Sequence, residues 1–74
     1  MKNYVVGILS MFENNLKLFK VSADNEYEAV KKGMLIFSNN DSNELEWQNS
    51  DDYPKDMEGL ITAYEELPFD VMEI

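Results

Sequence analysis

The side chains in this sequence that could take part in chemistry are almost all carboxylates. The 74 residues include fifteen Asp and Glu and six Lys, with no Arg, His or Cys. Without His or Cys, the serines and the single threonine lack the usual base of a nucleophilic site, and no Ser-x-x-Lys spacing supplies a lysine instead. The common Cys/His zinc sites are excluded, and the three glycines are too isolated to form a phosphate-binding loop. We therefore expect a protein that is not an enzyme and that binds no cofactor.

The acidic segment 51–58 is the strongest candidate for a cation site, because carboxylate oxygens are the ligands that Ca²⁺ and Mg²⁺ prefer. Its spacing departs from an EF-hand loop, since the glycine and the final glutamate are out of place. Asp41 and Asn43 match only the start of such a loop. We expect solvated surface acids here and predict no metal site.

The acids are concentrated in the second half of the chain. Residues 1–37 hold five lysines and four acids, a net charge of +1, whereas residues 38–74 hold one lysine and eleven acids, a net charge of −10. The sequence leaves two interpretations open, which are a surface that keeps a small protein soluble and a surface that binds a basic partner. Direct binding to nucleic acid is disfavoured, because it needs clustered Lys or Arg and the chain has one adjacent pair, Lys31-Lys32.

The candidate binding residues lie between 41 and 58, where seven acids accompany two aromatic side chains. Trp47 and Tyr53 either fill the edge of the core or act as anchors in an interface, since Trp and Tyr dominate interface hot spots. In the second case, the carboxylates take the place of nucleic-acid phosphates in the basic groove of a protein partner. The residues predicted to bind this partner are Asp41, Glu44, Glu46, Trp47, Asp51, Asp52, Tyr53, Asp56 and Glu58. Reversing the charge of Asp51, Asp52 and Asp56 is expected to weaken binding without loss of stability.

A short, acidic, arginine-free chain is similar, as a class, to small phage proteins that disable host defences or host enzymes, such as anti-CRISPR and DNA-mimic anti-restriction proteins. The resemblance implies a non-enzymatic inhibitor that blocks a nucleic-acid-binding surface of a host protein. The alternative is a small regulatory or accessory subunit, similar to an antitoxin, that binds through an apolar hairpin face. Salt separates the two hypotheses, because it screens a charge-led contact and spares an apolar one.

Length and composition predict one small folded domain over residues 1–74. Hydrophobic residues make up 45% of the chain and aromatic residues 12%, which excludes a disordered acidic tail. A secreted domain of this size would usually contain disulfides, so the absence of Cys favours the cytoplasm, or the host cytoplasm for a phage-encoded protein. The apolar run from Val5 to Leu9 is too short to span a membrane, and we expect no membrane partner.

Residues 3–22 are predicted to form a β-hairpin, because two runs rich in β-branched and aromatic residues flank the turn-forming residues 13–15. A two-residue loop at Asn14-Asn15 would pair Ser10 with Phe19, Ile8 with Val21, and Met11 with Leu18. One face would carry Tyr4, Val6, Ile8, Phe19 and Val21, and the other Val5, Leu9, Met11, Leu16 and Leu18. Two apolar faces need two covers, and a homodimer through the second face is one way to supply the second cover.

A helix is predicted over residues 24–37, with Asp24 as its N-cap and a polar loop, residues 38–43, after it. Its apolar residues recur at helical spacing and would lie on the sheet: Tyr27, Val30, Met34 and Phe37. Residues 44–48 alternate like a short strand, and residues 69–74 like a final strand. Residues 57–67 fit a helix and a strand almost equally, with the strand slightly favoured. The expected fold class is α+β, a single small domain of order β-β-α-β-β with one helix packed on an antiparallel sheet.

Overall fold

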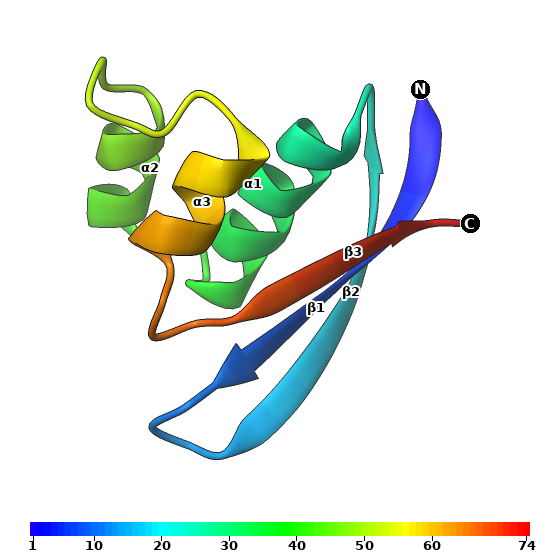
Figure 1. Cartoon of the computed structure of the whole chain (residues 1–74), viewed down its shortest axis with the longest axis horizontal. Helices are drawn as coiled ribbons and strands as arrows, with labels where there is room; N and C mark the ends of the chain where they lie inside the picture. Colours follow the sequence, from blue (N-terminus) through cyan, green and yellow to red (C-terminus); the bar gives the residue numbers. More distant parts are fainter.

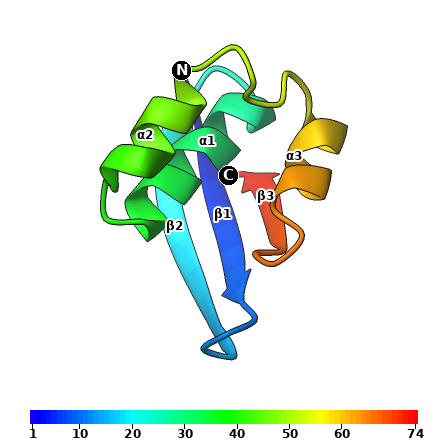
Figure 2. The same ribbon diagram turned by 90° about the vertical axis from the view of Figure 1, so that its left-hand side faces the viewer.

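Strands β1 (Lys2–Ser10), β2 (Asn15–Ala23) and β3 (Phe69–Glu73) form one antiparallel sheet in the order β2-β1-β3. Three helices, α1 (Glu26–Phe37), α2 (Ser42–Gln48) and α3 (Met57–Ala63), connect β2 to β3. In this computed structural model, which describes all residues from 1 to 74, every helix lies on the same side of the sheet (Figures 1 and 2). The predicted α+β class with an antiparallel sheet is confirmed. The predicted order with one helix is wrong, because the observed order is β-β-α-α-α-β.

The β1–β2 hairpin turns through residues 11–14, so its loop is longer than the predicted two residues. Asn14 adopts a left-handed backbone conformation (φ 51°), and the Ser10 hydroxyl accepts a hydrogen bond from the Glu13 N–H within the turn. The observed pairs are Ser10 with Asn15, Ile8 with Lys17 and Gly7 with Leu18, in place of the three predicted pairs. This register differs from the predicted one by four residues along β2. An even difference keeps every side chain of β2 on its predicted face.

The core lies between the sheet and the helices. Val6 and Ile8 of β1 have no exposed surface, and neither do Val30 of α1 and Leu60 of α3. Helix α1 approaches the sheet closely at Gly33, where a Cβ atom would stand 2.8 Å from Val6 Cγ1. The buried hydrophobic residues are Tyr4, Val6, Ile8, Val21, Ala23, Ala29, Val30, Met34, Tyr53, Leu60 and Tyr64. They come from β1, β2, α1, α3 and the α2–α3 connection, so one core joins both halves of the chain.

Helix α1 begins one residue later than predicted, because Asn25 and not Asp24 is its N-cap. The Asn25 side chain accepts a hydrogen bond from the Glu28 N–H at 2.9 Å. The helix ends at Phe37. Asn39 and Asn40, in the loop that follows, adopt left-handed backbone conformations. The predicted apolar stripe is confirmed, since its four residues are buried in the core or packed against it: Tyr27, Val30, Met34 and Phe37.

Residues 42–48 form helix α2, so the strand predicted over residues 44–48 is wrong. The Asp41 carboxylate accepts a hydrogen bond from the Asn43 N–H at 2.7 Å and caps the helix. Leu45 and Trp47 would share a face in a strand, but in a helix they lie about 200° apart. Trp47 accordingly packs against the core while Leu45 remains exposed. Five residues are too few to distinguish the two-residue period of a strand from the period of about 3.6 residues of a helix.

Residues 57–63 form helix α3, so the strand slightly favoured over residues 57–67 is also wrong. Asp56 caps this helix by accepting a hydrogen bond from the Gly59 N–H at 2.7 Å. The helical alternative put Met57, Leu60, Ile61, Tyr64 and Leu67 on one apolar stripe. All of them are buried in the core or packed against it except Ile61, which is exposed. The predicted final strand is confirmed as β3, which pairs with β1. None of the three helices is long and apolar enough to cross a membrane.

Candidate binding surfaces

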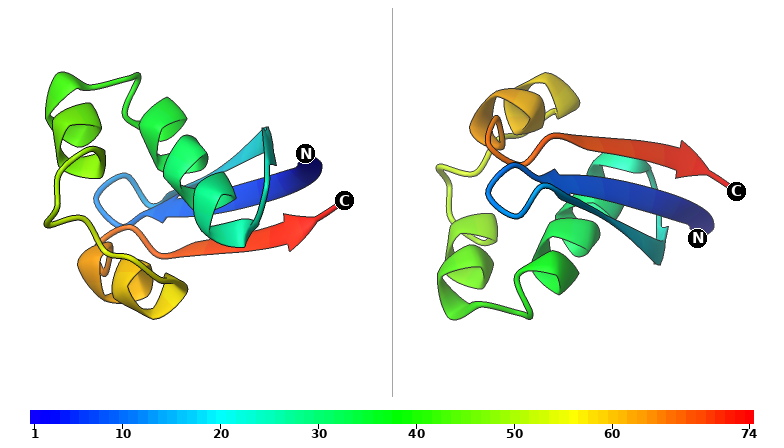
Figure 3. Two further views of the ribbon diagram at one scale, coloured as in Figure 1. Left: turned by 90° about the horizontal axis from the view of Figure 1, so that it is seen from above. Right: turned by 90° about the horizontal axis from the view of Figure 1, so that it is seen from below.

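One face of the sheet carries no helix, as Figure 3 shows from below. On β1 the even-numbered residues from Tyr4 to Ile8 face the helices, and the odd-numbered residues from Val5 to Leu9 face away. The cross-strand pairs place the corresponding residues of β2 and β3 on the same uncovered side. We call this surface the open sheet face, and its residues are Asn3, Val5, Gly7, Leu9, Leu16, Leu18, Lys20, Ser22, Pro68, Asp70 and Met72.

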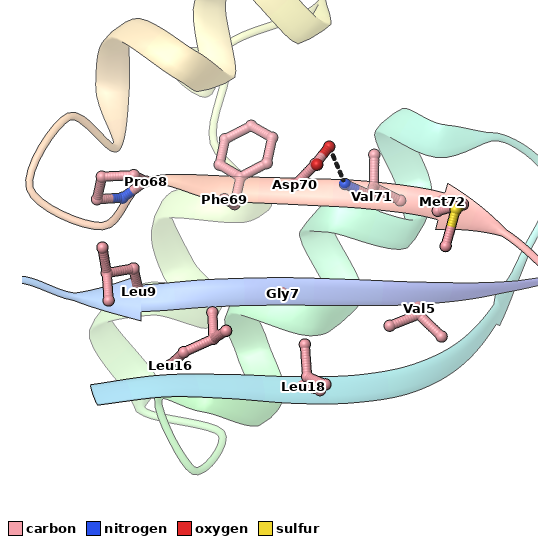
Figure 4. Close-up of a pocket in the computed structure, with 10 residues that line it drawn as sticks. All are labelled: Val5, Gly7, Leu9, Leu16, Leu18, Pro68, Phe69, Asp70, Val71 and Met72. Atoms are coloured by element: carbon pink, nitrogen blue, oxygen red, sulfur yellow. Dashed lines mark hydrogen bonds between the residues drawn. The ribbon is translucent and has the colours of Figure 1, made fainter.

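A shallow groove of about 410 Å³ lies on the open sheet face (Figure 4). Its floor is β1 at Gly7, and a Cβ atom at this position would stand 3.1 Å from Leu18 Cδ2. Leu16 and Leu18 border the groove on β2, and Met72 borders it on β3. Leu18 is 67% exposed and Met72 is 65% exposed. The groove therefore holds large apolar side chains in contact with water.

The polar residues of the open sheet face lie at its margins. Asn3 and Ser22 stand at the end near the chain termini and satisfy each other, since the Ser22 hydroxyl donates to Asn3 Oδ1 at 2.9 Å. Lys20 lies on β2 and Asp70 on β3, so β1 separates them. These two are the charged residues of the face, and their charges cancel. The face is therefore neutral in a chain whose net charge is −9.

The hairpin turn extends the apolar surface beyond the strands. Phe12 is 82% exposed and borders a hollow on the helical side with Phe37 and Leu67, whereas Met11 beside it is exposed at the tip. Met11 was predicted to lie on the second face of the hairpin, but it falls within the four-residue turn and so belongs to no strand. The apolar end of the open sheet face is thus the hairpin end, remote from the termini (Figure 1).

The predicted acidic residues lie on the helical side of the molecule, away from the open sheet face. We call them the acidic layer, which consists of Asp41, Glu44, Glu46, Asp51, Asp52, Asp56 and Glu58. Glu46, Asp51, Asp52 and Glu58 are exposed, and no lysine lies within 4.0 Å of them. The one ion pair of the molecule joins Lys2 to Glu73 near the termini, at the far end of the sheet.

Three of the seven acids have a structural role. Asp41 and Asp56 cap α2 and α3, and Glu44 accepts a hydrogen bond from the Tyr64 hydroxyl at 2.9 Å. Reversing the charge of Asp56 would remove a helix cap, which costs about 1 kcal/mol. The cap argues against the expectation that the triple change at Asp51, Asp52 and Asp56 makes the protein no less stable. Glu46 is the suitable third position, because it is exposed and its side chain caps nothing.

Tyr53, Tyr64 and Glu44 form a hydrogen-bonded chain at the edge of the core. Tyr64 donates to the Glu44 carboxylate, so its oxygen is left to accept the hydroxyl proton of Tyr53, 2.9 Å away. Burial raises the pKa of Tyr53 to about 12 and raises the pKa of Tyr64 further, so both stay protonated at neutral pH. Burial also raises the pKa of Glu44, and the hydrogen bond from Tyr64 opposes that effect in part.

Trp47 and Tyr53 pack against each other, with ring centroids 4.8 Å apart, and both contact Tyr64. Tyr53 is 2% exposed and lies inside the core. Trp47 is half-buried at the core edge, and Lys31 Nζ lies 5.4 Å from the Tyr53 ring centroid. Tyr53 therefore presents almost no surface to a partner in this conformation, and Trp47 presents one edge.

The acids of the chain do not gather into a cation site. No group of three or more Asp or Glu side chains is placed to hold a metal ion. The segment 51–58 instead spreads its acids along the α2–α3 connection and the first turn of α3.

Comparisons with protein-family models, curated proteins and solved structures found no match to this chain.

Sequence reasoning missed four features of these surfaces. It did not place Pro68, Asp70 and Met72 on the open sheet face, because the pairing of β3 with β1 depends on contacts 60 or more residues apart along the chain. It also missed Tyr64 as the partner of Glu44. A signal for α2 was present, since Asp41 and Glu44 have the N-cap and N3 spacing of a capping box.

Proposed function

We propose that this protein is a non-enzymatic binding domain that engages another protein chain through its open sheet face. The observation that supports the proposal is the uncovered apolar groove over Gly7, flanked by Leu18 and Met72. A sheet normally buries an apolar face against a second layer, and here the helices provide that layer on one side only. Burying a leucine or methionine side chain contributes about 2 kcal/mol, so covering this face would be favourable.

The placement of the polar residues supports the same proposal. Interfaces have an apolar centre that is depleted of charge and a polar rim. On the open sheet face, Leu9, Leu16 and Leu18 lie towards the hairpin end, Lys20 lies nearer the termini on β2, and Asp70 borders the groove on the other edge strand, β3. The alternative predicted from the sequence, a small regulatory or accessory subunit that binds through its apolar hairpin face, uses this surface.

A second candidate function uses the acidic layer to occupy a basic, nucleic-acid-binding surface of a protein partner, as a phage-encoded inhibitor would. The observation that favours it is that Glu46, Asp51, Asp52 and Glu58 are exposed and have no lysine partners. Such a contact would form quickly by electrostatic steering and would weaken as salt is added. The two candidates therefore use opposite sides of the molecule and respond differently to salt.

Affinity capture from a bacterial lysate with matched variants tests the proposal. Leu18→Asp places a charge on the open sheet face, and Ile61→Asp places the same charge on α3, where Ile61 is 58% exposed. We expect Leu18→Asp to lose a partner that the parent and Ile61→Asp retain at about 50 and 500 mM salt. Retention by Leu18→Asp would contradict the proposal. A partner lost with Glu46→Lys/Asp51→Lys/Asp52→Lys, and lost by the parent at high salt, would support the acidic layer.

A further inference from the structure

We propose that the open sheet face is the contact surface of a homodimer, in which two copies pack sheet against sheet about a twofold axis parallel to β1. The inference rests on the proposed function, because it names the occupant of the same surface. The twofold axis places β2 of each copy over β3 of the other, with both β1 strands near the axis. Leu16 and Leu18 of one copy then lie opposite Pro68 and Asp70 on β3 of the other copy.

The two charges on the face are arranged for such a pairing. Lys20 is paired with Val5 across β1 and β2. Asp70 is paired with Gly7, which is two residues further along β1. Within one copy β1 lies between Lys20 and Asp70, and neither forms an ion pair. The twofold operation moves each Lys20 over the β3 edge of the other copy, about 7 Å along the strand from Asp70. A lysine side chain spans that offset, so the dimer would have two symmetric Lys20–Asp70 pairs at its rim.

Charge distinguishes a second copy from other occupants. The open sheet face is neutral, because Lys20 and Asp70 cancel, although the chain carries −9. A basic partner would be drawn to the acidic layer on the helical side, and an anionic lipid surface would be repelled by the net charge. A copy of the same face offers a largely apolar surface, with an acid within reach of each lysine, because Lys20 lies opposite Met72 and one step along β3 from Asp70.

Repulsion between two copies of charge −9 is limited by the position of the acids. Face-to-face packing leaves both acidic layers on the outside of the dimer, with two sheets and their core side chains between them (Figure 1). The shortest extent of one molecule is 22 Å. The Debye length at physiological salt is about 8 Å, so the layers are screened from each other. Added salt should therefore change this dimer little, whereas it would weaken binding to a basic surface.

The size of the face sets the expected affinity. Three strands about 4.8 Å apart, two of which are about 30 Å long, offer a projected area of roughly 400 Å² per copy. The exposed side chains of Leu16 and Leu18 stand off this surface and increase the accessible area. The total buried area is then about 1,000 Å², the lower end for a specific interface. We expect a dissociation constant of about 10–100 µM.

Sedimentation equilibrium of the full chain tests the dimer from about 1 µM to 1 mM. The parent should change from 8.6 kDa to twice that mass over this range. Leu18→Asp should weaken association at least tenfold, and Ile61→Asp, which has the same net charge, should associate like the parent. A parent that stays at 8.6 kDa at 1 mM would overturn the inference, as would a Leu18→Asp variant that dimerises normally.

A mixing experiment tests the twofold arrangement without relying on Leu18→Asp. Lys20→Asp and Asp70→Lys each create two like-charge contacts in the proposed homodimer, so each variant alone should dimerise more weakly than the parent. In an equimolar mixture, every contact at the rim would again join a lysine to an aspartate. Association in the mixture should therefore exceed that of either variant alone at about 50 mM salt. A mixture that associates no better than the separate variants would overturn the arrangement.

The outcomes also separate this inference from the proposed function. If the parent is monomeric and Leu18→Asp alone loses a lysate protein, the open sheet face binds a different chain and the homodimer is wrong. If the parent is monomeric and Leu18→Asp retains every partner, both the homodimer and the proposed function are wrong. Dimerisation that depends on Leu18 and is restored by mixing supports both.

Discussion

The two faces of the sheet differ in their surroundings far more than in their residue types. Towards the helices, β1 presents Val6 and Ile8, which have no exposed surface. Away from them it presents Val5 and Leu9, which are partly exposed beside the exposed Leu18. A strand that is apolar on both faces is typical of a strand buried on both faces. The comparison indicates that the helical layer accounts for the stability of the monomer, and the open sheet face is the surface that we propose for binding.

The polar groups of the two sides differ in the same sense. On the helical side, no buried side-chain nitrogen or oxygen lacks a hydrogen-bond partner. On the open sheet face, Lys20 and Asp70 are exposed and form no ion pair within the chain. Substitutions on the helical side should therefore change the free energy of unfolding, and substitutions on the open sheet face should change association.

The largest expected contrast is between Ile8 and Leu18. Ile8→Ala removes methyl and methylene groups from a site with no exposed surface, and should lower the free energy of unfolding by about 3 kcal/mol. Ile8→Val should cost about 1 kcal/mol and remains measurable if the alanine variant does not fold. Leu18→Ala should change it by less than about 0.5 kcal/mol at a few micromolar protein, where the chain is monomeric. Urea unfolding followed by circular dichroism measures all three, and an equal cost at both positions would contradict the contrast.

The next effect concerns the hydrogen-bonded chain on the helical side. Tyr64→Phe leaves the Tyr53 hydroxyl without its acceptor and Glu44 without its donor, so it should cost about 2 kcal/mol. Tyr53→Phe removes one hydrogen bond but leaves Tyr64 bonded to Glu44, so it should cost about 1 kcal/mol. The same unfolding measurement compares them. A Tyr53→Phe variant that is less stable than Tyr64→Phe would contradict the proton order in this chain.

A smaller effect on the free energy of unfolding separates the acids that cap helices from the acids that cap none. Asp56→Ala removes the cap of α3 and should lower the free energy of unfolding by about 1 kcal/mol. Asp51→Ala removes an exposed acid that caps no helix, and should change it little or raise it slightly by reducing the net negative charge. Thermal unfolding of the two variants at neutral pH would show the difference, and equal melting temperatures would argue against a capping role for Asp56.

The smallest expected effect is a dependence of stability on pH that arises from Glu44. Burial raises the pKa of this carboxyl in the folded protein above its ordinary value of 4.5. The folded state therefore binds more protons than the unfolded state between these two values, and Glu44 makes stability fall as pH rises through the raised pKa. Glu44→Gln should remove this component and flatten the profile of unfolding free energy between pH 4.5 and 7. An identical profile in the parent and the variant would contradict the shift.

The hairpin, helix α1 and strand β3 followed from local pattern, and helices α2 and α3 did not. The two faces of the hairpin were predicted correctly although the turn was two residues too short, because the register error was even. The stripe from Tyr27 to Phe37 is long enough to define a helical period. Helices α2 and α3 have seven residues each, and their caps at Asp41 and Asp56 were stronger signals than their apolar spacing.

The candidate surfaces were predictable to different degrees. Leu9, Leu16 and Leu18 followed from alternation along the hairpin. The sequence did not show that these leucines stay uncovered, because their exposure depends on all three helices packing on the other side of the sheet. Tyr53 could not be assigned to the core from its position in a polar segment, since its burial depends on contacts with α3 and Trp47.

The central claim is that the open sheet face binds and the helical side does not, and methyl NMR with a soluble paramagnetic agent tests it most directly. Leu18 and Ile61 are exposed to similar extents in one copy, at 67% and 58%. At about 20 µM protein, where a dissociation constant of about 10–100 µM leaves much of the chain monomeric, the agent should still enhance the relaxation of Leu18 substantially. At about 1 mM, Leu18 should become more strongly protected while Ile61 keeps its full enhancement. Equal enhancement of both residues at every concentration, or protection of Ile61 alone, would contradict the account.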